Sequence, residues 1–435
     1  MRTYAISTLA EAPDGELVLY LLQLVQALRY DNISNQTSKE PKGIDRKSSL
    51  GAFLIDRASK NMELANYLYW YLKVETEDAQ YGQTYQNVFK ALQEKLSQIP
   101  MKTDSTPTQQ PQYTGVLDSV SKLGSSLSEK ASGRVKCSIT MWDVLSVQDT
   151  FISSLMECQQ ASRFARGKKD TKEQHLREQL KSKACSTIHN GWAVPLPSAP
   201  NIQVTGVEAS TAIMFTSALY PALLEFHVHS GNLIKDKKER DNSKSQKKEV
   251  YKVIVKVSIK CDTRCFYFSL ILTPHFFLQT GDDLRQDQLV IALIKLMDRI
   301  LKRGALDLCL IPYDILATGP TSGLVEFVQN SVPISNILDS NNNSILNFFK
   351  KNAPLEGVPY GVNPEVMQTY IRSCAGYCVI TYLIGVGDRH LDNMMIQQNG
   401  HFFHIDFGYI FGRDPKPFPP AFRLTREVSK VSELL

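Results

Sequence analysis

Two short polar motifs near the end of the sequence constrain the fold of this chain more than any other feature. The first, GVGDRHLDNMMI, places Asp388, Arg389, His390 and Asn393 in one loop, and the second, HIDFG, contains Asp406. Asp406 follows Asn393 by thirteen residues, which is long enough for a short hairpin to bring it back beside that loop. Either motif alone carries little weight because short polar loops are common, but together they predict one site.

This arrangement suits phosphoryl transfer from a nucleotide. His390 would act as a base or a transition-state stabiliser, because an imidazole titrates near working pH. Asp388 would orient it or bind near the phosphates, and Asn393 and Asp406 would offer oxygen ligands to Mg2+. Upstream, Lys256 on a predicted strand can neutralise phosphate oxygens. An isolated histidine is usually structural and an isolated loop Asp or Asn is usually a turn residue, but the two motifs together favour the catalytic interpretation.

Length and composition limit the alternatives. A chain of 435 residues predicts two or three domains, and the net charge of +5 is weak evidence for any partner, so we expect no nucleic acid. The N-terminus lacks a signal-peptide pattern, and the apolar run from Cys265 to Leu278 is interrupted by Ser269, Pro274 and His275. We therefore expect a soluble, intracellular protein.

The eight cysteines do not predict a zinc site. Two pairs have C-x3-C spacing, Cys261 with Cys265 and Cys374 with Cys378, and neither matches the spacing of zinc ligands. The second pair lies in a helical pattern, where small thiols four residues apart are buried core.

The spacing of apolar residues divides the chain into regions with helical patterns and regions with β-type patterns. Apolar residues recur with helical spacing from Leu17 to Tyr30 and from Leu50 to Val74, and a second helical region runs from Met141 to about Lys183. Short β-type segments follow Trp192, and the pattern turns helical again after Gln288. A strand pair is expected at Leu308 to Leu316 and Gly323 to Gln329, and His404 is expected to be structural.

Several long motifs resemble one family. GDDLRQDQLVIALIKLMDRIL, SCAGYCVITYLIGVGDRHLDNMMI and HFFHIDFGYIFGRDPKPFPP resemble the phosphatidylinositol 3-kinases, most of all their class III, vacuolar-sorting members. LVLYLLQLVQALRYDN and LIDRASKNMELANYLYWYLKVE resemble the accessory helical domain of those enzymes. The resemblance covers most of the chain apart from residues 103–140, 235–248 and 257–279.

The resemblance implies an α+β fold, in which a bilobal kinase of the phosphatidylinositol 3- and 4-kinase type follows an all-α accessory domain. The N-lobe would be β-rich and the C-lobe mostly helical and truncated. The implied bounds are 1–100 for the C-terminal part of the helical domain, 101–140 for a disordered linker, 141–322 for the N-lobe with insertions at 235–248 and 257–279, and 323–435 for the C-lobe.

The resemblance also implies a nucleotide pocket. Lys256 resembles the strand lysine on the ATP phosphates, although an edge-strand lysine is the plain alternative. Asp287 resembles a helix acid facing the pocket, or is a helix-surface acid. Tyr313 resembles the pocket tyrosine, or is core packing. Glu326 and Val328 would meet adenine through backbone groups, which leaves their side chains weakly constrained.

A phosphate-binding loop is implied as well. The sequence has no G-x-G-x-x-G motif of the kind that protein kinases use, and IMFTSALYPA resembles the serine-bearing phosphate loop of the family, with Ser217 and backbone amides available to the phosphates. A plain turn between strands is the alternative. The missing motif favours a lipid kinase over an ordinary protein kinase.

The implied reaction transfers the γ-phosphate of ATP to the 3-hydroxyl of phosphatidylinositol, giving phosphatidylinositol 3-phosphate for endosomal trafficking and autophagy. His390, Asp388 and Arg389 would form the catalytic set, and Asn393 and Asp406 would hold Mg2+, with Mn2+ as an alternative. The segment after HIDFG has no run of basic residues that could offset the charge of an already phosphorylated headgroup, so plain phosphatidylinositol is the expected substrate.

The resemblance further implies partners and a location. These are a regulatory protein kinase subunit, a Beclin-type subunit and phosphatidylinositol-containing membranes, with the protein cytoplasmic and peripheral on endosomal and autophagic membranes. Two alternatives stay open: an inactive truncated isoform that acts only as a binding fragment, and a phosphatidylinositol 4-kinase or large protein kinase of the same superfamily.

One stretch interrupts the family pattern. Without Val257 to Gln279, Lys256 joins Thr280 and the chain reads VIVKTGDDLRQDQL. The stretch begins Val-Ser and ends Phe-Phe-Leu-Gln, which can be encoded as the two ends of an intron, so we interpret it as translated intron sequence or a genuine insertion. The terminal VSKVSELL also begins Val-Ser, where a complete C-lobe would continue, and the N-terminus is expected to begin inside the helical domain with no C2 domain ahead of it.

Overall fold

The structure is a computed structural model that describes residues 2–31, 49–101, 139–183, 185–188, 191–216, 219–229, 250–257, 283–418 and 428. Four predicted features lie wholly or almost wholly outside this range: the linker at 101–140, the loop at 235–248, Ser217, and the interrupting stretch beyond Val257. Among the described residues no helix is both long enough and apolar enough to cross a membrane.

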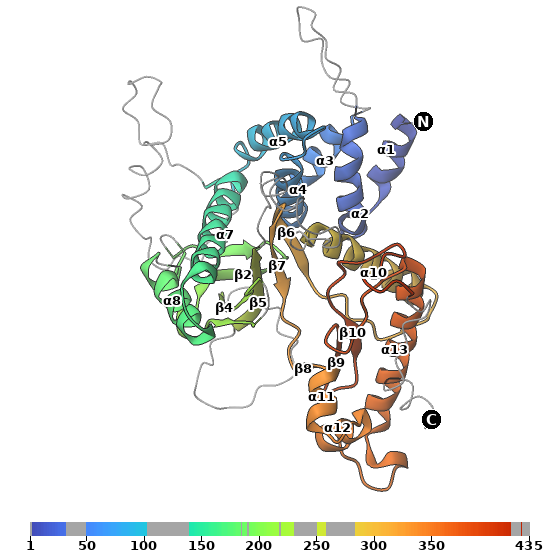
Figure 1. Cartoon of the computed structure of the whole chain (residues 1–435). Coiled ribbons are helices and arrows are strands. Elements are labelled where there is room, and N and C mark those ends of the chain that lie inside the picture. The colour runs from blue at the N-terminus through green and yellow to red at the C-terminus, as the bar shows by residue number, and fades with distance from the viewer. Residues whose placement is uncertain are drawn as a thin grey trace, which may run out of the picture.

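Helices dominate both ends of the chain, with an antiparallel sheet between them (Figure 1). The α-helices are α1 (Arg2–Glu11), α2 (Asp14–Ala27), α3 (Leu50–Ala58), α4 (Met62–Glu75), α5 (Gly82–Leu96), α7 (Met141–Phe164), α8 (Lys169–Ser182), α10 (Leu284–Arg303), α11 (Ile334–Ser340), α12 (Ile345–Asn352) and α13 (Pro364–Ile384). The strands are β1 (Val194–Leu196), β2 (Ala199–Val207), β3 (Ile213–Met214), β4 (Ala222–Val228), β5 (Val250–Val257), β6 (Ile315–Gly319), β7 (Ser322–Glu326), β8 (Ser331–Pro333), β9 (Met394–Gln397) and β10 (Phe402–His404).

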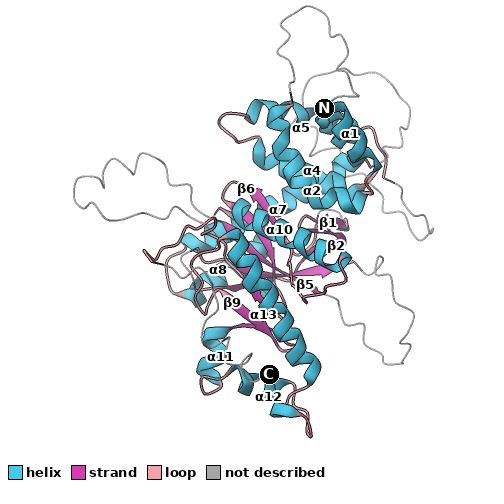
Figure 2. Cartoon of the chain, turned by 90° about the vertical axis from the view of Figure 1, so that its right-hand side faces the viewer, coloured by secondary structure: helices cyan, strands magenta, loops and turns pink. Residues whose placement is uncertain are grey.

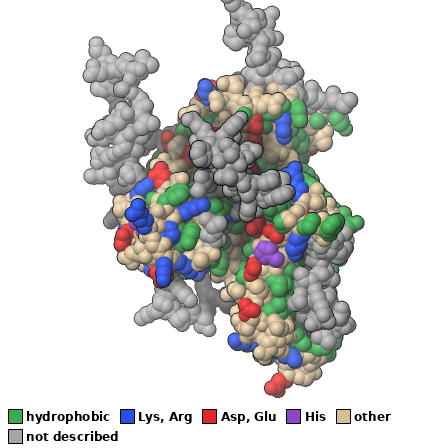
Figure 3. Space-filling model, in the orientation of Figure 1, with side chains coloured by type: hydrophobic (Ala, Val, Ile, Leu, Met, Phe, Trp, Pro, Cys, Tyr) green, Lys and Arg blue, Asp and Glu red, His purple; other side chains and the backbone are tan. Residues whose placement is uncertain are grey.

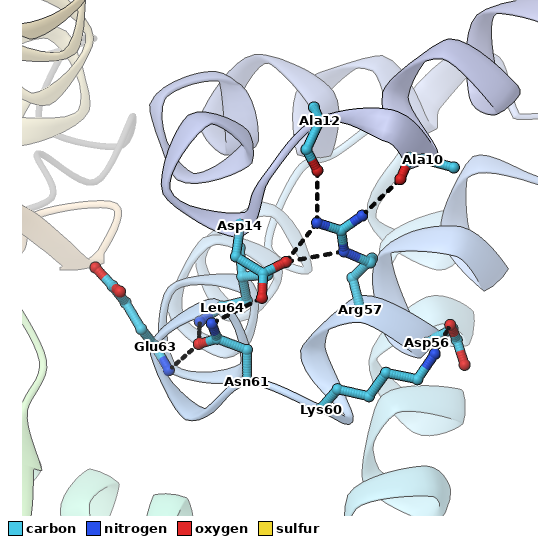
Figure 4. Close-up of polar contacts among 9 residues, drawn as sticks. All are labelled: Ala10, Ala12, Asp14, Asp56, Arg57, Lys60, Asn61, Glu63 and Leu64. Carbon is cyan, nitrogen blue, oxygen red and sulfur yellow. Dashed lines mark hydrogen bonds and ion pairs between the residues drawn. The ribbon is translucent and has the colours of Figure 1, made fainter.

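Helices α1 to α5 gather at one end of the molecule, at the top of Figure 1. The predicted helix over Leu50 to Val74 is two helices, because Asn61 caps α4: its Oδ1 accepts hydrogen bonds from the backbone N–H groups of Glu63 at 2.9 Å and Leu64 at 3.2 Å. The Nδ2 of Asn61 also donates to Asp14 at 3.0 Å (Figure 4). Asp14 in turn accepts from Nε of Arg57 at 2.9 Å, which ties α2, α3 and α4 together.

The large sheet has the strand order β1-β2-β4-β5-β7-β6, and β3 pairs with β4. Every pairing in it is antiparallel. Helix α7 packs against β1 and β5, and α10 packs against β6. The second predicted helical region is thus α7 followed by α8, and α7 begins with a capping box in which Thr140 and Asp143 bond each other's backbone N–H.

The C-lobe is built on a small sheet of order β10-β9-β8, flanked by α11, α12 and α13 (Figure 2). Strand β7 spans the expected lobe boundary at 322/323 and pairs with β5 and β6, so the large sheet extends to Glu326. The chain then passes through β8 into the C-lobe. The predicted α+β class, a β-rich lobe and a mostly helical lobe after an all-α segment, is confirmed.

One hydrophobic cluster spans the helical region and the large sheet, and a second fills the C-lobe together with α10. A buried polar network crosses the first cluster. Trp70 Nε1 donates to Gln148 Oε1 at 2.8 Å, and Gln148 Nε2 donates to Asn66 Oδ1 at 2.7 Å and to the carbonyl of Pro195 at 2.6 Å. Asn66 Nδ2 reaches the carbonyl of Pro197 at 2.9 Å, so α4, α7 and β1 are joined by satisfied hydrogen bonds.

Candidate active site

The DRH loop follows α13 through a tight turn. The helix ends at Gly385, whose φ of 63° lies in the left-handed region that glycine adopts without penalty. A Cβ on Gly387 would lie 2.1 Å from the carbonyl oxygen of Arg413, so only glycine fits there. The left-handed φ of Gly385 and the close approach at Gly387 explain why the motif begins GVG. The backbone N–H of Gly387 also donates to the carbonyl of Tyr409 at 2.8 Å.

A hairpin brings the two polar motifs together, as the thirteen-residue spacing predicts. Strands β9 and β10 pair in antiparallel register with Met394 opposite His404. One step further, the N–H of Ile405 donates to the carbonyl of Asn393 at 3.1 Å. Asn393 and Asp406 therefore lie at the same open end of the hairpin.

Arg389 fastens the loop to the second motif from inside. Its side chain is almost fully buried, and its guanidinium donates to the carbonyls of Gly387 at 2.8 Å, Ile405 at 2.8 Å and, by a short contact, Asp406. Burial lowers the pKa of Arg389, and the nearby carboxylates oppose that shift. The guanidinium lies 5.6 Å from the ring centre of Phe407. These contacts hold backbone, so Arg389 has the geometry of a positioning residue.

His390 is exposed on the outer side of the loop. Its Nδ1 accepts a hydrogen bond from the backbone N–H of Asp392 at 3.2 Å and lies 3.7 Å from the carboxylate oxygen Oδ2 of the same residue. The space-filling view shows a histidine side chain at the surface with acidic side chains beside it (Figure 3). An exposed imidazole with one nitrogen engaged can present the other to a substrate.

His404, unlike the exposed His390, is buried. It lies between aromatic rings, 5.5 Å from Tyr377 and 5.1 Å from Phe402 between ring centres. Burial, together with the charge of Arg389, keeps its pKa well below the usual range, so the ring is neutral. The structure thus places His404 in the core, as the sequence predicts.

The open end of the hairpin fits a hard divalent cation. Asn393 is buried, and its Nδ2 donates to the carbonyl of Asp388 at 3.1 Å, so the amide oxygen is the atom that it offers. Asp406 is exposed, and its Oδ1 accepts a long bond of 3.3 Å from the N–H of Gly408. Two oxygen ligands, completed by phosphates and water, are typical of Mg2+ sites. The described residues contain no cluster of three or more His, Cys, Asp or Glu that would suit a different metal.

Asp287 and Tyr313, the two residues predicted to face the nucleotide, both contact the segment that contains Phe403 and Phe407. Oδ1 of Asp287 accepts the backbone N–H of Phe407 at 2.6 Å, directly beside Asp406. The ring of Tyr313 packs edge-on against Phe403 at 6.1 Å, and burial raises its pKa well above the usual range, with Asp287 and Asp406 adding to the shift. The phenol is therefore a neutral group.

The remaining predicted residues lie on the large sheet or beyond it. Lys256 is on β5, opposite Gly323 of β7, and Ser217 lies outside the described residues. The carbonyl of Val328, just after β7, accepts a hydrogen bond from the Ser331 hydroxyl at 2.6 Å. The described contacts thus unite Asp287, Tyr313 and the DRH loop, and place Lys256 through strand pairing.

The expectation that the Glu326 side chain is weakly constrained is wrong. Its Oε2 accepts the backbone N–H of Asp314 at 2.8 Å, and its own N–H donates to the Asp314 carbonyl at 2.7 Å. Burial raises the pKa of Glu326, with the Asp314 N–H and the Tyr251 hydroxyl opposing the shift. The side chain is part of the structure that closes the β6–β7 pair.

Two residues near the site were missed in the sequence. Gln286 donates from Nε2 to the carbonyl of Phe407 at 2.6 Å, and Asp414 accepts the N–H of Asp388 at 3.0 Å through Oδ2. The signal for Gln286 was its place next to Asp287 in GDDLRQD. Asp414 carried no signal, because its role depends on the return of the chain to the loop.

Comparison with known proteins agrees with this geometry. Residues 274–433 match the profile described as phosphatidylinositol 3- and 4-kinase, and residues 1–104 match the accessory, or PIK, domain of the phosphoinositide 3-kinase family. A kinase fold with a loop and hairpin of this kind, preceded by that accessory domain, defines the class: the chain belongs to the phosphatidylinositol 3- and 4-kinase family.

Within the family, its relatives are phosphatidylinositol 3-kinases, which confirms the class III resemblance. Phosphatidylinositol 3-kinase pik3 of Schizosaccharomyces pombe is 38% identical over 432 residues, covering 98% of this chain and 43% of the relative. Phosphatidylinositol 3-kinase VPS34 of Arabidopsis thaliana is 33% identical over 429 residues, and VPS34 of Saccharomyces cerevisiae is 32% identical over 472 residues. The chain spans less than half the length of these relatives, 43%, 42% and 44% in turn.

Proposed function

We propose that this chain carries the catalytic part of an ATP-dependent phosphatidylinositol 3-kinase that phosphorylates the 3-hydroxyl of phosphatidylinositol. The observation that carries the proposal is the pairing of β9 with β10, which sets Asn393 and Asp406 at one end of a hairpin with His390 exposed on the adjoining loop. The names of the relatives support the lipid and the position of transfer.

In this proposal, Asn393 and Asp406 would hold Mg2+, and the bound cation would neutralise charge on the phosphates of ATP. The 3-hydroxyl oxygen forms a bond to the γ-phosphorus as the bond to the bridging oxygen breaks and ADP leaves. The hydroxyl proton must go to a base. The nucleotide would be bound by six further residues. Glu326 and Val328 would contact it through backbone groups, and the others are Lys256, Asp287, Tyr313 and Ser217.

The contact between His390 and Asp392 bears on that proton. With Nδ1 accepting the Asp392 N–H, the neutral ring carries its proton on Nε2 and can donate to the phosphoryl oxygens in the transition state. To act as the base at Nε2, the ring needs its proton on Nδ1, where the Asp392 carboxylate, 3.7 Å away, would accept it. We propose that His390 acts as a hydrogen-bond donor while its Nδ1 accepts the Asp392 N–H. It would act as the base once Nδ1 carries the proton and donates to the Asp392 carboxylate.

The finer parts of the proposal rest on the resemblance to class III enzymes that the sequence motifs carry. They are a product used in endosomal trafficking and autophagy, a regulatory protein kinase subunit, a Beclin-type subunit, and a peripheral location on endosomal and autophagic membranes. Plain phosphatidylinositol is preferred because Arg413 and Lys416 alone cannot offset the charge of a bisphosphate headgroup.

The test measures phosphate transfer by the purified chain to vesicles of phosphatidylinositol and of its 4,5-bisphosphate, with and without Mg2+. The expected result is transfer to phosphatidylinositol alone, at the 3-position, lost in Asp406→Asn and kept in the exposed control Asp339→Asn. Transfer to the 4-position would favour a 4-kinase. Absence of any transfer, with nucleotide binding retained, would favour a binding fragment.

A further inference from the structure

The first turn of α10 sends three consecutive side chains to the backbone of other segments. Gln286 reaches the backbone carbonyl of Phe407, and Asp287 reaches its backbone N–H. Gln288 Oε1 accepts the N–H of Ala317 on β6 at 2.6 Å. All three contacts join residues that are far apart in the chain. The first turn of this helix therefore connects the large sheet to the HIDFG segment of the C-lobe.

The Phe407 backbone is held at both of its polar groups. Gln286 Nε2 donates to its carbonyl oxygen at 2.6 Å, and Asp287 Oδ1 accepts from its N–H at 2.6 Å. The Phe407 side chain is fully buried, so the residue has little freedom to rotate. Gln286 itself is half-buried.

The residue just before Phe407 needs such support. Asp406 has a φ of 60°, in the left-handed region that a residue with a Cβ rarely adopts. Arg389 holds the carbonyl of Ile405, on the N-terminal side, and the carbonyl of Asp406 itself. On its C-terminal side, Gln286 and Asp287 hold Phe407. Asp406 is thus bracketed by hydrogen bonds from two different elements.

We infer that Gln286 is a positioning residue for Asp406: by holding the Phe407 carbonyl, it keeps the Asp406 carboxylate aimed at the divalent cation. This rests on the proposed function, in which Asp406 is a cation ligand. The bland alternative is that Gln286 only ties α10 to the C-lobe and contributes to stability.

Gln288 is a matched control for this distinction. It is the same residue type, two positions along the same helix. Its side-chain amide also bonds a backbone group, but as the acceptor of the Ala317 N–H on β6. Replacing either glutamine by methionine keeps the volume and removes the bond. A purely structural role predicts similar effects of the two substitutions on the site.

The experiment measures amide hydrogen exchange in the metal-free, nucleotide-free chain and in Gln286→Met and Gln288→Met. In Gln286→Met, we expect exchange at residues 405–408 to rise about tenfold, the factor that one hydrogen bond of ordinary strength supplies. In Gln288→Met, exchange should rise at Ala317 and stay within about twofold of wild type at 405–408. Equal exchange at 405–408 in wild type and Gln286→Met would overturn the inference, as would an equal rise in both variants.

A second measurement tests the link to the cation. The Mg2+ concentration that half-saturates ATP binding should rise several-fold in Gln286→Met and stay unchanged in Gln288→Met. An unchanged Mg2+ requirement in Gln286→Met, despite faster exchange, overturns the positioning role. If the wild-type chain binds no Mg2+–ATP, the proposed function fails, and exchange at 405–408 alone decides whether Gln286 holds the segment.

Discussion

Nη1 of Arg389 donates a hydrogen bond to the carbonyl of Ile405 at 2.8 Å, one residue before Asp406. An arginine in a DRH motif invites a direct catalytic interpretation, and the family resemblance implies that Arg389 belongs to the catalytic set. Its guanidinium is instead directed at backbone carbonyls in the interior, where it sets the distance between the loop and the segment after β10 that contains Asp406.

Substituting Arg389 by lysine should therefore lower both turnover and stability. Lysine keeps the charge, but its compact ammonium group cannot span the carbonyls of Gly387, Ile405 and Asp406. We expect turnover to fall at least about 100-fold and the free energy of unfolding to fall by about 2–3 kcal/mol. Thermal unfolding and a lipid kinase assay measure the two effects. The exposed Arg413→Lys serves as control, and a wild-type rate in Arg389→Lys would contradict the positioning role.

His390→Ala should separate chemistry from stability. Because the side chain is exposed, the midpoint of thermal unfolding should stay within about 1 °C of wild type. Loss of an acid–base or donor group should lower kcat about 100- to 10,000-fold. His401→Ala, at the turn end of the same hairpin, should keep its rate. Near-normal turnover in His390→Ala would remove this residue from the mechanism.

Glu326 should make stability depend on pH. Burial raises its pKa in the folded state, so its contribution to stability is fully present below the unfolded pKa, near 4.3, and is lost as pH rises through the folded value. Glu326→Gln keeps an acceptor for the Asp314 N–H and cannot ionise. Its free energy of unfolding, relative to wild type, should therefore increase between pH 4 and 7.

Chemical denaturation at a series of pH values measures this difference. The exposed Glu356→Gln provides the control and should show no comparable trend. Parallel curves for wild type and Glu326→Gln would mean that the carboxylate is solvated in the folded protein.

Gln148→Leu should destabilise the joint between the helical region and the large sheet. The substitution leaves Trp70 Nε1, Asn66 Oδ1 and the Pro195 carbonyl without partners in the interior. The expected cost is about 2–4 kcal/mol. Thermal unfolding measures it, with the exposed Gln174→Leu as control. A stability equal to wild type would show that water replaces the amide.

Deletion of residues 257–279 tests the interpretation of the interrupting stretch, which stays a prediction because all of it beyond Val257 lies outside the described residues. An uncharged, β-prone run such as Phe266 to Leu272 favours aggregation. We expect the deletion to raise soluble yield and ATP affinity. Lower values of both would identify the stretch as a genuine structural element.

Features that depend on local spacing were predictable. The hairpin between Asn393 and Asp406 followed from the number of residues between them, and the helices from apolar periodicity. The break between α3 and α4 was not, because apolar spacing continues through it and only the cap at Asn61 ends the pattern.

The strand predicted at Leu308 to Leu316 was wrong over most of its length, since β6 is Ile315–Gly319. Cys309 has a left-handed φ of 52°, and the Ile311 carbonyl accepts the Tyr377 hydroxyl at 2.8 Å, so α13 fixes this segment in an irregular path. The hydrogen-bond partners of Arg389 and Gln286 could not be predicted from the sequence either. These partners are backbone carbonyls that the tertiary fold brings near, and a backbone carbonyl is the same in every residue type.

The hydrophobic cluster shared by the helical region and the large sheet affects how the protein would be degraded in the cell. Leu68, Leu72, Leu145 and Val204 belong to one interior, although the sequence between them changes character completely. Cleavage of the chain after Leu96 would expose apolar surface on both fragments. The accessory helices and the sheet should therefore survive or be degraded together, as a single unit of quality control.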